Sequence, residues 1–413
     1  MSSYLFRNAT IVDGEQPQPR AGFDVLVEGE RIREVSDRPL ASSTAIVFDL
    51  KGRTLMPGLI DAHAHVFAIY LNMWRAEDMP LTLMTCMSLE RLKGALDRGF
   101  TTIRDTGGGE FGIKQAIERG AVPGPRLFIS GKAISQTGGH GDMRRRTDDG
   151  PICACENNAH RFTCRLADGV AEMRRAVRDE LRKGADQIKI MASGGVGSPN
   201  DPLENRQFSV EEVAAAVDEA QAWNTYVCAH AYTAHAIRHA VSNGVRSIEH
   251  GNLIDAPTAQ LMAERGAFMV PTLVCYQETA EHGERLGLSA VVMDKLARVN
   301  KAGIQMLEIC KQAGVKMGFG TDLMGELHVA QSREFLIRAE ILGAHDVIRS
   351  ATKINAEILN RSGELGIVAP GALADLLVVD GDPLRDLGLL QDQGAHLAAI
   401  MKGGSFHKNR LAA

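Results

Sequence analysis

Short apolar runs alternate with longer helical patterns between about residue 56 and residue 365. This alternation is typical of parallel βα units, in which buried strands are covered by helices. A series of such units long enough for a barrel of about 250–300 residues predicts an α/β protein built on a (β/α)8 TIM barrel. The candidate strands are 58–65, 101–107, 126–131, 185–192, 226–232, 247–251, 268–273 and 317–322.

The helical segments carry their own start and stop signals. Ser209 and Glu212 have the spacing of a capping box at a helix start. Several helices are followed by a glycine that suits a left-handed C-cap. These glycines are Gly99, Gly184, Gly244, Gly266 and Gly314.

Both ends of the chain show short strands with polar turns instead of βα units. Neither end is long enough to bury a core alone. We therefore expect residues 1–55 and 366–413 to form one small β-sandwich domain, with the barrel of residues 56–365 inserted between them. The expected strands are 4–12, 24–28, 31–35, 45–49, 375–380 and 398–402.

The segment 140–165 interrupts the βα rhythm, because it is long, polar, and rich in arginine and cysteine. A loop of this length is usually a lid or a binding loop. Its arginines are candidates for pairing with a substrate carboxylate, whereas the spacing of its cysteines and His160 fits no familiar zinc site. The arginines are Arg144, Arg145, Arg146, Arg161 and Arg165, and the cysteines are Cys153, Cys155 and Cys164.

Composition and charge narrow the class of protein. The chain has 413 residues, 23% of them charged, and a net charge of −5, with no basic stripe of the kind that binds nucleic acid. The start shows no signal-peptide pattern, and no stretch approaches the roughly 18 apolar residues of a membrane span. We therefore expect a cytoplasmic protein with no nucleic-acid or membrane partner, which forms a homo-oligomer.

Potential metal ligands fall at the ends of the predicted strands. His63 and His65 end the first strand, where residues two apart point to the same side. His230, His250 and Asp322 end the fifth, sixth and eighth strands, and Lys189 lies in the fourth. Each residue alone is more often a core or capping residue, but six at matched ends of barrel strands predict one active site. Imidazole and carboxylate donors favour Zn²⁺, with Mn²⁺, Co²⁺ or Fe²⁺ as alternatives.

This arrangement resembles the amidohydrolase superfamily, and the lead-in Met56-Pro57-Gly58-Leu59-Ile60-Asp61 extends the match. Further segments are similar to bacterial prolidase-like and Xaa-Arg-type metallo-dipeptidases and to related N-acyl amino acid amidohydrolases, such as ochratoxin amidases. These segments are 136–141 (QTGGHG), 188–195 (IKIMASGG) and 230–232 (HAY).

The resemblance implies two divalent metal ions, most simply Zn²⁺, on His63, His65, Lys189, His230, His250 and Asp322. A buried amine loses its proton more easily than one in water, and a neutral amine can add CO₂ to form a carbamate. The resemblance implies that Lys189 is carboxylated in this way and bridges the two metals.

The resemblance also implies roles for the remaining site residues. Asp322 would act as general base and then as general acid, and His140 would donate a hydrogen bond to the oxyanion. Tyr232 would bind the carboxylate of a small-molecule substrate. We therefore expect hydrolysis of a dipeptide such as Xaa-Pro, or of an N-acyl amino acid, including ochratoxin-like amides.

Two alternatives stay open. A deaminase or cyclic-amide hydrolase with one metal, such as an imidazolonepropionase-like enzyme, could use the same fold, but it would not need a bridging lysine at position 189. A non-catalytic scaffold would be expected to have lost some of the six ligand positions, and all of them are filled. Two, one or no metals per chain would distinguish the three readings.

Overall fold

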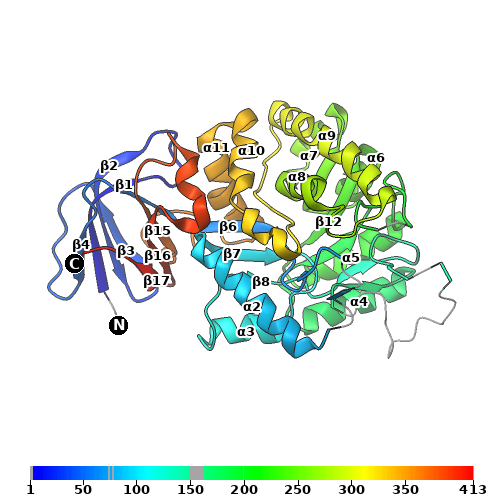
Figure 1. Ribbon diagram of the computed structural model, residues 1–413, viewed down its shortest axis with the longest axis horizontal. Coiled ribbons are helices and arrows are strands. Elements are labelled where there is room, and N and C mark those ends of the chain that lie inside the picture. The colour runs from blue at the N-terminus through cyan, green and yellow to red at the C-terminus, as the bar shows by residue number, and fades with distance from the viewer. Residues whose placement is uncertain are drawn as a thin grey trace.

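The computed structural model describes residues 3–72, 75–76, 79–144, 146–147, 162–198 and 200–412. Strands from both chain ends form one sheet at the left of Figure 1, and the parallel α/β core lies to the right, with its helices on the outside. The fold is thus the predicted combination of a parallel α/β core and a mixed sheet built by both termini.

The core strands form two parallel ladders, one in the order β6-β7-β8 and one in the order β10-β9-β11-β12-β13-β14. Their bounds are β6 Leu59–Ala64, β7 Phe100–Asp105, β8 Arg126–Phe128, β9 Ala133–Ser135, β10 Cys164–Leu166, β11 Ile188–Met191, β12 Val227–Thr233, β13 Ser247–Leu253 and β14 Phe268–Val270. The predicted strand 126–131 ends early, at Phe128, and the chain bends at Gly131 (φ +65°) before β9. β9 and β10, on either side of the polar segment, were not predicted.

Backbone hydrogen bonds join the two ladders into a closed barrel. Asp186 N donates to Ile129 O at 2.7 Å, which joins the end of β8 to the start of β11. On the other side, Met317 bridges Met269 of β14, and Ala62 N of β6 donates to Phe319 O at 2.8 Å. The eighth strand, predicted over 317–322, is therefore present only as an irregular segment.

The side chain of Asn355 explains this irregularity, because it takes the place of a ladder partner. Its amide nitrogen donates to Ile60 O (2.6 Å) and to Phe319 O (2.8 Å), and its amide oxygen accepts from Phe319 N (3.0 Å). Asn355 is fully buried, so water cannot form hydrogen bonds with these backbone groups in its place.

Helices cover the barrel, and the predicted start and stop signals are confirmed. Ser209 and Glu212 form the capping box of α5, and all five predicted C-terminal glycines have positive φ. The α-helices are α2 Leu81–Asp97, α3 Phe111–Glu118, α4 Val170–Arg182, α5 Val210–Ala222, α6 Ala234–Ser242, α7 Ala256–Glu264, α8 Leu273–His282, α9 Ala290–Ala313, α10 Arg333–Leu342, α11 Ala344–Arg349 and α12 Asn355–Ile358. Shorter turns are η1 Gly325–Ala330, the π-helical η2 Ser350–Ile354, η3 Leu387–Leu390 and η4 Asp392–Gly394.

The terminal sheet has the order β17-β16-β15-β5-β1-β2-β3, with β4 also paired to β1. Its strands are β1 Ser3–Ile11, β2 Arg20–Glu28, β3 Arg31–Ser36, β4 Ile46–Asp49, β5 Thr54–Pro57, β15 Leu376–Val379, β16 Leu397–Lys402 and β17 Ser405–Asn409. β5 and β17 were not among the predicted strands.

The sandwich is one sheet that curls back on itself. β17 and β1 lie four strand spacings apart in the sheet, roughly 19 Å if the sheet were flat. Yet the rings of Tyr4 on β1 and Phe406 on β17 are 5.0 Å apart, and Phe48 on β4 lies 5.7 Å from Phe406. The aromatic rings therefore fill the inside of the curl. The domain boundaries at 55/56 and 365/366 stay a prediction.

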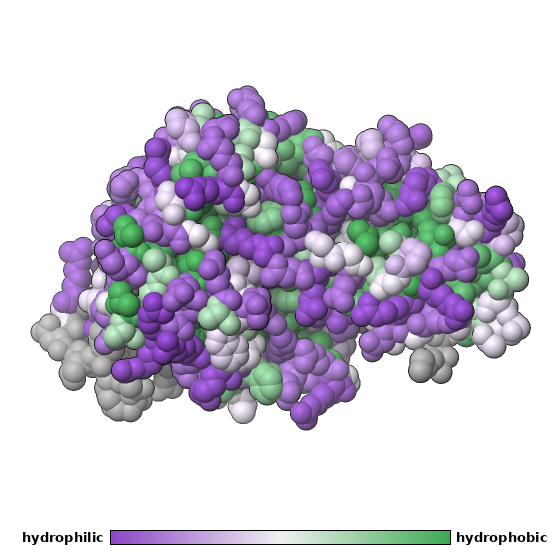
Figure 2. Space-filling model, turned by 180° about the vertical axis from the view of Figure 1, so that it is seen from behind, coloured by the Kyte–Doolittle hydropathy of each residue, from purple (hydrophilic) through white to green (hydrophobic). Residues whose placement is uncertain are grey.

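The back of the molecule is covered mainly by hydrophilic residues, with hydrophobic ones interspersed in small groups (Figure 2). Among the described residues, no helix is both long and apolar enough to cross a membrane.

We predict that Asn355→Ala lowers the melting temperature, because Phe319 N and Ile60 O lose their side-chain partner inside the barrel. Each buried group left unpaired costs about 1–3 kcal/mol. Asn409→Ala is the control, because Asn409 is an exposed asparagine that accepts a single bond from Leu411 N. Thermal unfolding followed by circular dichroism measures both variants, and equal melting temperatures would contradict the role of Asn355.

Candidate metal centre and active site

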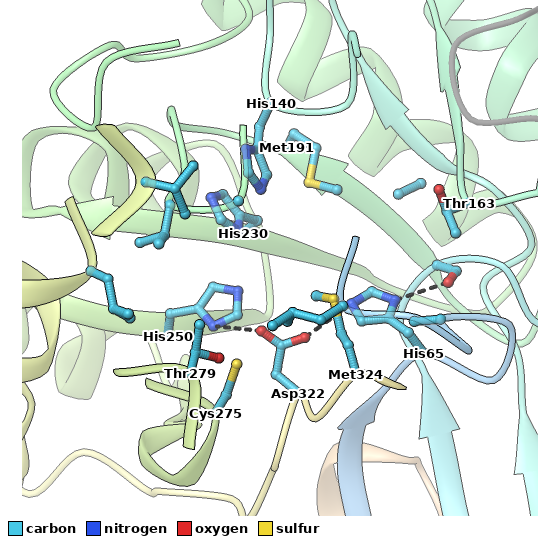
Figure 3. A pocket seen from close by; sticks show the side chains of 18 of the residues that line it. His65, His140, Thr163, Met191, His230, His250, Cys275, Thr279, Asp322 and Met324 are labelled. Carbon is cyan, nitrogen blue, oxygen red and sulfur yellow. Dashed lines mark hydrogen bonds and ion pairs between the residues drawn. The ribbon is translucent and has the colours of Figure 1, made fainter. Parts of the chain in front are cut away.

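The six predicted ligand residues come together at the carboxyl ends of the core strands, where TIM barrels place their active sites. They line one cavity of ≈ 350 Å³. Figure 3 shows Asp322 between His65 and His250, with His230 and His140 side by side further along the cavity. The residues are His63, His65, Lys189, His230, His250 and Asp322.

Three of these residues form a compact, buried group of potential metal ligands. One side-chain donor atom each from His63, His250 and Asp322 lie within 4.8 Å of one another. Asp322 Oδ1 is 3.2 Å from His65 Nε2 and 3.5 Å from His63 Nε2. His63 Nε2 and Asp322 Oδ1 are both buried without a hydrogen-bond partner. Buried polar atoms are rarely left unpaired, so this donor set fits a divalent cation.

The other nitrogen of each imidazole is held by the protein, which leaves a lone pair on the remaining nitrogen. Carbonyl and carboxylate oxygens only accept, so the facing nitrogen must carry the proton. Thr272 has one proton and donates it to Tyr276, so it accepts from His250. The pairs are His63 Nδ1 with Glu249 Oε2 (2.7 Å), His65 Nδ1 with Gly107 O (2.9 Å), His230 Nε2 with Gly194 O (3.2 Å) and His250 Nδ1 with Thr272 Oγ1 (2.9 Å). This is the form in which imidazole binds metals.

The electrostatics of the site favour the metal-binding protonation states of three candidate ligands, His230, His250 and Asp322. Burial, with the nearby His140, His250 and Lys189, holds the pKa of His230 well below its usual value. Burial and the proximity of His63 do the same to the pKa of His250. Burial acts to raise the pKa of Asp322, but the neighbouring imidazoles, His63 first, hold it well below its usual value. At neutral pH His230 and His250 are therefore neutral and Asp322 is ionised. For His65, burial acts to lower the pKa, but the neighbouring Asp322 carboxylate raises it above its usual value.

Two members of the group have an unusual backbone. His250 and Asp322 have φ values of +75° and +52°, in the left-handed region that non-glycine residues rarely adopt. Residues held in such conformations concentrate at functional sites. At Gly320, a Cβ atom would lie 2.7 Å from His63 Cβ, so only glycine lets the irregular eighth segment approach β6.

Lys189 lies on β11, opposite Cys228 of β12, with an exposed fraction of 1%. It lines the cavity together with the imidazoles, and its positive charge contributes to the lowered pKa values of His230 and His250. Lys189 is thus a buried amine on the wall of the cavity that the potential metal ligands line.

His140 reaches the site from the loop after β9. Its ring stacks on that of His230, with centroids 4.3 Å apart and an interplanar angle of 16°. Its Nδ1 lies 3.0 Å from Ser198 Oγ and 3.1 Å from Asp201 Oδ2, and Asp201 Oδ2 also accepts from Gly195 N at 2.8 Å. The ring is thereby fixed between His230 and the loop 195–201.

A buried lysine secures that loop. Lys295 of α9 donates to three backbone carbonyls, those of Gly195 (3.0 Å), Ser198 (2.8 Å) and Asp201 (2.6 Å). Its side chain is 8% exposed. The position of His140 therefore depends on a helix that follows it by some 150 residues in the chain.

Tyr232 lies beside the imidazoles, as predicted. Its ring stacks on His250 with a centroid distance of 5.2 Å, and its hydroxyl is 2.9 Å from the hydroxyl of Tyr276. Tyr276 accepts a further bond from Thr272 (3.3 Å). A chain of hydrogen bonds thus runs from His250 through Thr272 and Tyr276 to Tyr232. Burial raises the pKa of both phenols well above its usual value, so both stay protonated.

The remaining walls of the cavity are mainly apolar. Those arginines of segment 140–165 that the structure describes do not line the cavity. Arg144 pairs with Asp142, Arg146 with Asn200, and Arg165 with Asp179 and Glu180. Arg145, Arg161, Cys153, Cys155 and His160 lie outside the described residues. The apolar wall includes Met143, Met191, Val196, Leu288, Val292 and Leu296.

Sequence reasoning missed several residues that support the site. Glu249 and Arg104 were detectable, because each is a charged residue inside a predicted strand of the barrel. Asp201 gave no such signal, because it lies in a loop whose approach to the site depends on the folded chain. Thr272 and Tyr276 lie at or just after the end of the predicted strand 268–273, where a barrel places its active site, but nothing local in the sequence shows that they contact His250 and Tyr232.

Comparison with known proteins accounts for this site. Residues 54–405 match the model of the amidohydrolase family. The chain belongs to this family. A solved amidohydrolase is 52% identical, with a TM-score of 0.96 and coverage of 99% of both chains. A prolidase solved with N-methylphosphonate-L-proline is 49% identical, with a TM-score of 0.96 and coverage of 99% of this chain and 100% of that one.

Ochratoxinase from Aspergillus niger is 32% identical over 378 residues, which cover 86% of this chain and 75% of that enzyme. The family member described here is thus a metal-dependent amidohydrolase, acting on carbon–nitrogen bonds and related to prolidases and ochratoxinase.

We predict that Gly195→Ala lowers kcat with little change in metal content. A Cβ atom at Gly195 would lie 2.1 Å from the ring of His140, so the ring must move. Displacing a catalytic group by about 1 Å can cost about 10²-fold in rate. Gly197→Ala in the same loop is the control, because its Cβ would meet no atom within 4 Å. Steady-state kinetics and metal analysis of both variants test this, and equal kcat values would contradict a role for His140.

Proposed function

We propose that this amidohydrolase uses two divalent metal ions to cleave an amide whose amine side carries a free α-carboxylate. The substrates would be dipeptides such as Xaa-Pro, or N-acyl amino acids, including ochratoxin-like amides. The observation that carries the proposal is the cavity itself, in which metal-ligand donors, a buried lysine and a phenol meet between apolar walls.

The donor set suggests how two cations would be held. His63, His65 and Asp322 would hold one, His230 and His250 the other, and Lys189, carboxylated by CO₂, would bridge them. Nitrogen and oxygen donors favour Zn²⁺. When bound, the cations would activate water and polarise the scissile carbonyl.

The chain's own residues would handle protons and charge. Asp322, ionised among the imidazoles, would accept a proton from water and pass it to the leaving amine. His140, fixed by Asp201 and Ser198, would donate a hydrogen bond to the oxygen of the scissile carbonyl, where negative charge develops.

Two relatives support the substrate class. The solved prolidase binds N-methylphosphonate-L-proline, which combines a free carboxylate with a tetrahedral group on the proline nitrogen, as an amide carbon would have after attack by water. Ochratoxinase is the second relative. Tyr232 follows His230 by two residues on β12. Its hydroxyl would lie about one residue's length from the scissile carbonyl, and so it could bind the α-carboxylate of the substrate.

A deaminase or cyclic-amide hydrolase with one metal is the alternative, and a non-catalytic scaffold is a third reading. Lys189 beside the imidazoles favours the two-metal amidase over both. A homo-oligomer, a cytoplasmic location, and the absence of nucleic-acid and membrane partners stay predictions.

We predict that the purified protein binds about two divalent metals per chain and that Lys189 is carboxylated. Lys189→Ala should lose most of the activity, and short carboxylic acids should partly restore it by replacing the carbamate. Metal analysis and a crystal structure of the loaded enzyme test this. Two metals beside an unmodified ammonium at Lys189 would contradict the carbamate, and one metal would favour the deaminase reading.

We predict that Tyr232→Phe lowers kcat/KM for substrates with a free carboxylate. A hydrogen bond to a charged group contributes about 1.5–3 kcal/mol, which is roughly 10- to 150-fold. Amidated versions of the same substrates should be poor already and little affected. Tyr4→Phe is the control, because Tyr4 packs against Phe48 and Phe406 in the terminal sheet and does not line the cavity. If the wild-type enzyme cleaves amidated and free substrates equally well, Tyr232 does not read the carboxylate.

A further inference from the structure

The four imidazoles among the candidate metal ligands, those of His63, His65, His230 and His250, differ in the group that accepts the proton of their second nitrogen. Three donate to neutral oxygens, those of Gly107, Gly194 and Thr272. In the described part of the chain, His63 alone of the four donates this nitrogen's proton to a carboxylate, Glu249, and at 2.7 Å this contact is also the shortest of the four.

Glu249 is itself held by charge and hydrogen bonds. Arg104 NH2 donates to both of its oxygens, at 2.8 and 2.9 Å, and Ser247 Oγ donates to Oε1 at 2.7 Å. Arg104 is fixed in turn, because its Nε donates to Ala62 O (2.5 Å) and its NH1 to Ser247 Oγ (3.1 Å). Ala62 directly precedes His63, so the guanidinium holds both the backbone and the side-chain partner of that histidine.

This network lies inside the barrel, away from water. His63, Arg104, Ser247 and Glu249 each have an exposed fraction of 0%. A charged hydrogen-bond acceptor is stronger than a neutral one, and the difference is larger where water is excluded. A carboxylate that accepts the proton on Nδ1 raises the basicity of the lone pair on Nε2. That lone pair faces Asp322.

We propose that Arg104 and Glu249 are positioning residues that make His63 the strongest imidazole donor of the site. The cation on His63, His65 and Asp322 is then held more tightly than the one on His230 and His250. This inference rests on the proposed two-metal function. It adds that the two positions differ in affinity and assigns the difference to the Arg104–Glu249 pair.

A purely structural role for the pair is the competing explanation, and the chain offers a matched control. Glu334 and Arg338 form a second buried pair of the same residue types, each 0% exposed, with Arg338 Nε 3.9 Å from Glu334 Oε1. Glu334 accepts a hydrogen bond from Val274 N, and within the described part of the chain it makes no hydrogen bond or ion pair with any of the imidazoles. Burial raises the pKa of Glu334 to about 8. Glu334→Gln therefore controls for placing an amide in a buried Glu–Arg pair, and it does not alter the partner of any imidazole.

The test titrates the metal-free full chain with Zn²⁺ against a competing chelator and fits one dissociation constant for each metal. We expect Glu249→Gln to raise the constant of the tighter metal by about 10- to 100-fold, the usual effect of an outer-shell partner, and to spare the weaker one. Thr272→Val, which removes the partner of His250, should raise the weaker constant instead. Glu334→Gln should change neither. Loading with Co²⁺ provides a spectroscopic readout, in which Glu249→Gln should alter the visible absorption of the first equivalent.

Each outcome decides between the explanations. If Glu249→Gln lowers the melting temperature of the metal-free protein and leaves both constants unchanged, the pair is structural and the proposal is wrong. If Glu249→Gln does not fold, the variant Arg104→Met/Glu249→Gln removes both charges and keeps an amide oxygen opposite His63, and it should show the same rise. If the wild-type chain binds one metal or none, the proposed two-metal function is wrong. If it binds two metals with equal affinity, the proposed function stands and the inference about Arg104 and Glu249 is wrong.

Discussion

The structure depends on how polar donor atoms are kept together in a site shielded from water. Asp322 Oδ1 and His63 Nε2 lie 3.5 Å apart, both buried and without a hydrogen-bond partner among the described residues. Such an arrangement is costly unless a cation completes it, because desolvated polar groups that stay unpaired destabilise the fold. The surrounding chain reduces this cost by binding the second nitrogen of each of the four imidazoles, so that these rings cannot rotate out of the site.

The backbone conformation also helps to keep these polar atoms together. His250 and Asp322 adopt positive φ at the ends of their segments, and the eighth segment of the barrel lacks a regular ladder. Asn355 supplies the missing hydrogen bonds from a helix that begins after the barrel segments are complete. The irregular segment can therefore turn the carboxylate of Asp322 toward His63 and His65 while the barrel stays closed.

The substrate side of the cavity is assembled from more distant parts. Lys295 ties α9 to the loop 195–201, and Asp201 in that loop orients His140 against His230. Tyr276 of α8 lies behind Tyr232 of β12. Elements that follow the core strands thus fix the two residues proposed to contact the substrate, so changes in α8 or α9 alter the site without touching a metal ligand.

The sequence by itself determined the class of fold and the places of the candidate ligands on the strands, because hydrophobic periodicity and strand ends are local properties. The His63–His65 spacing and the single residues His230, His250 and Asp322 all fall at predicted strand ends, and parallel strands bring such ends together. Arg104 and Glu249 were visible only as charged residues inside predicted barrel strands, and the sequence did not show that they pair with each other. The tertiary structure alone decided three other features. These are the curl of the terminal sheet, the hydrogen bonds of the Asn355 side chain to the barrel backbone, and the contacts of Asp201, Thr272 and Tyr276 with the site. Each joins residues that are far apart in the chain or that lie in loops, where no periodic pattern records which side chain will face which.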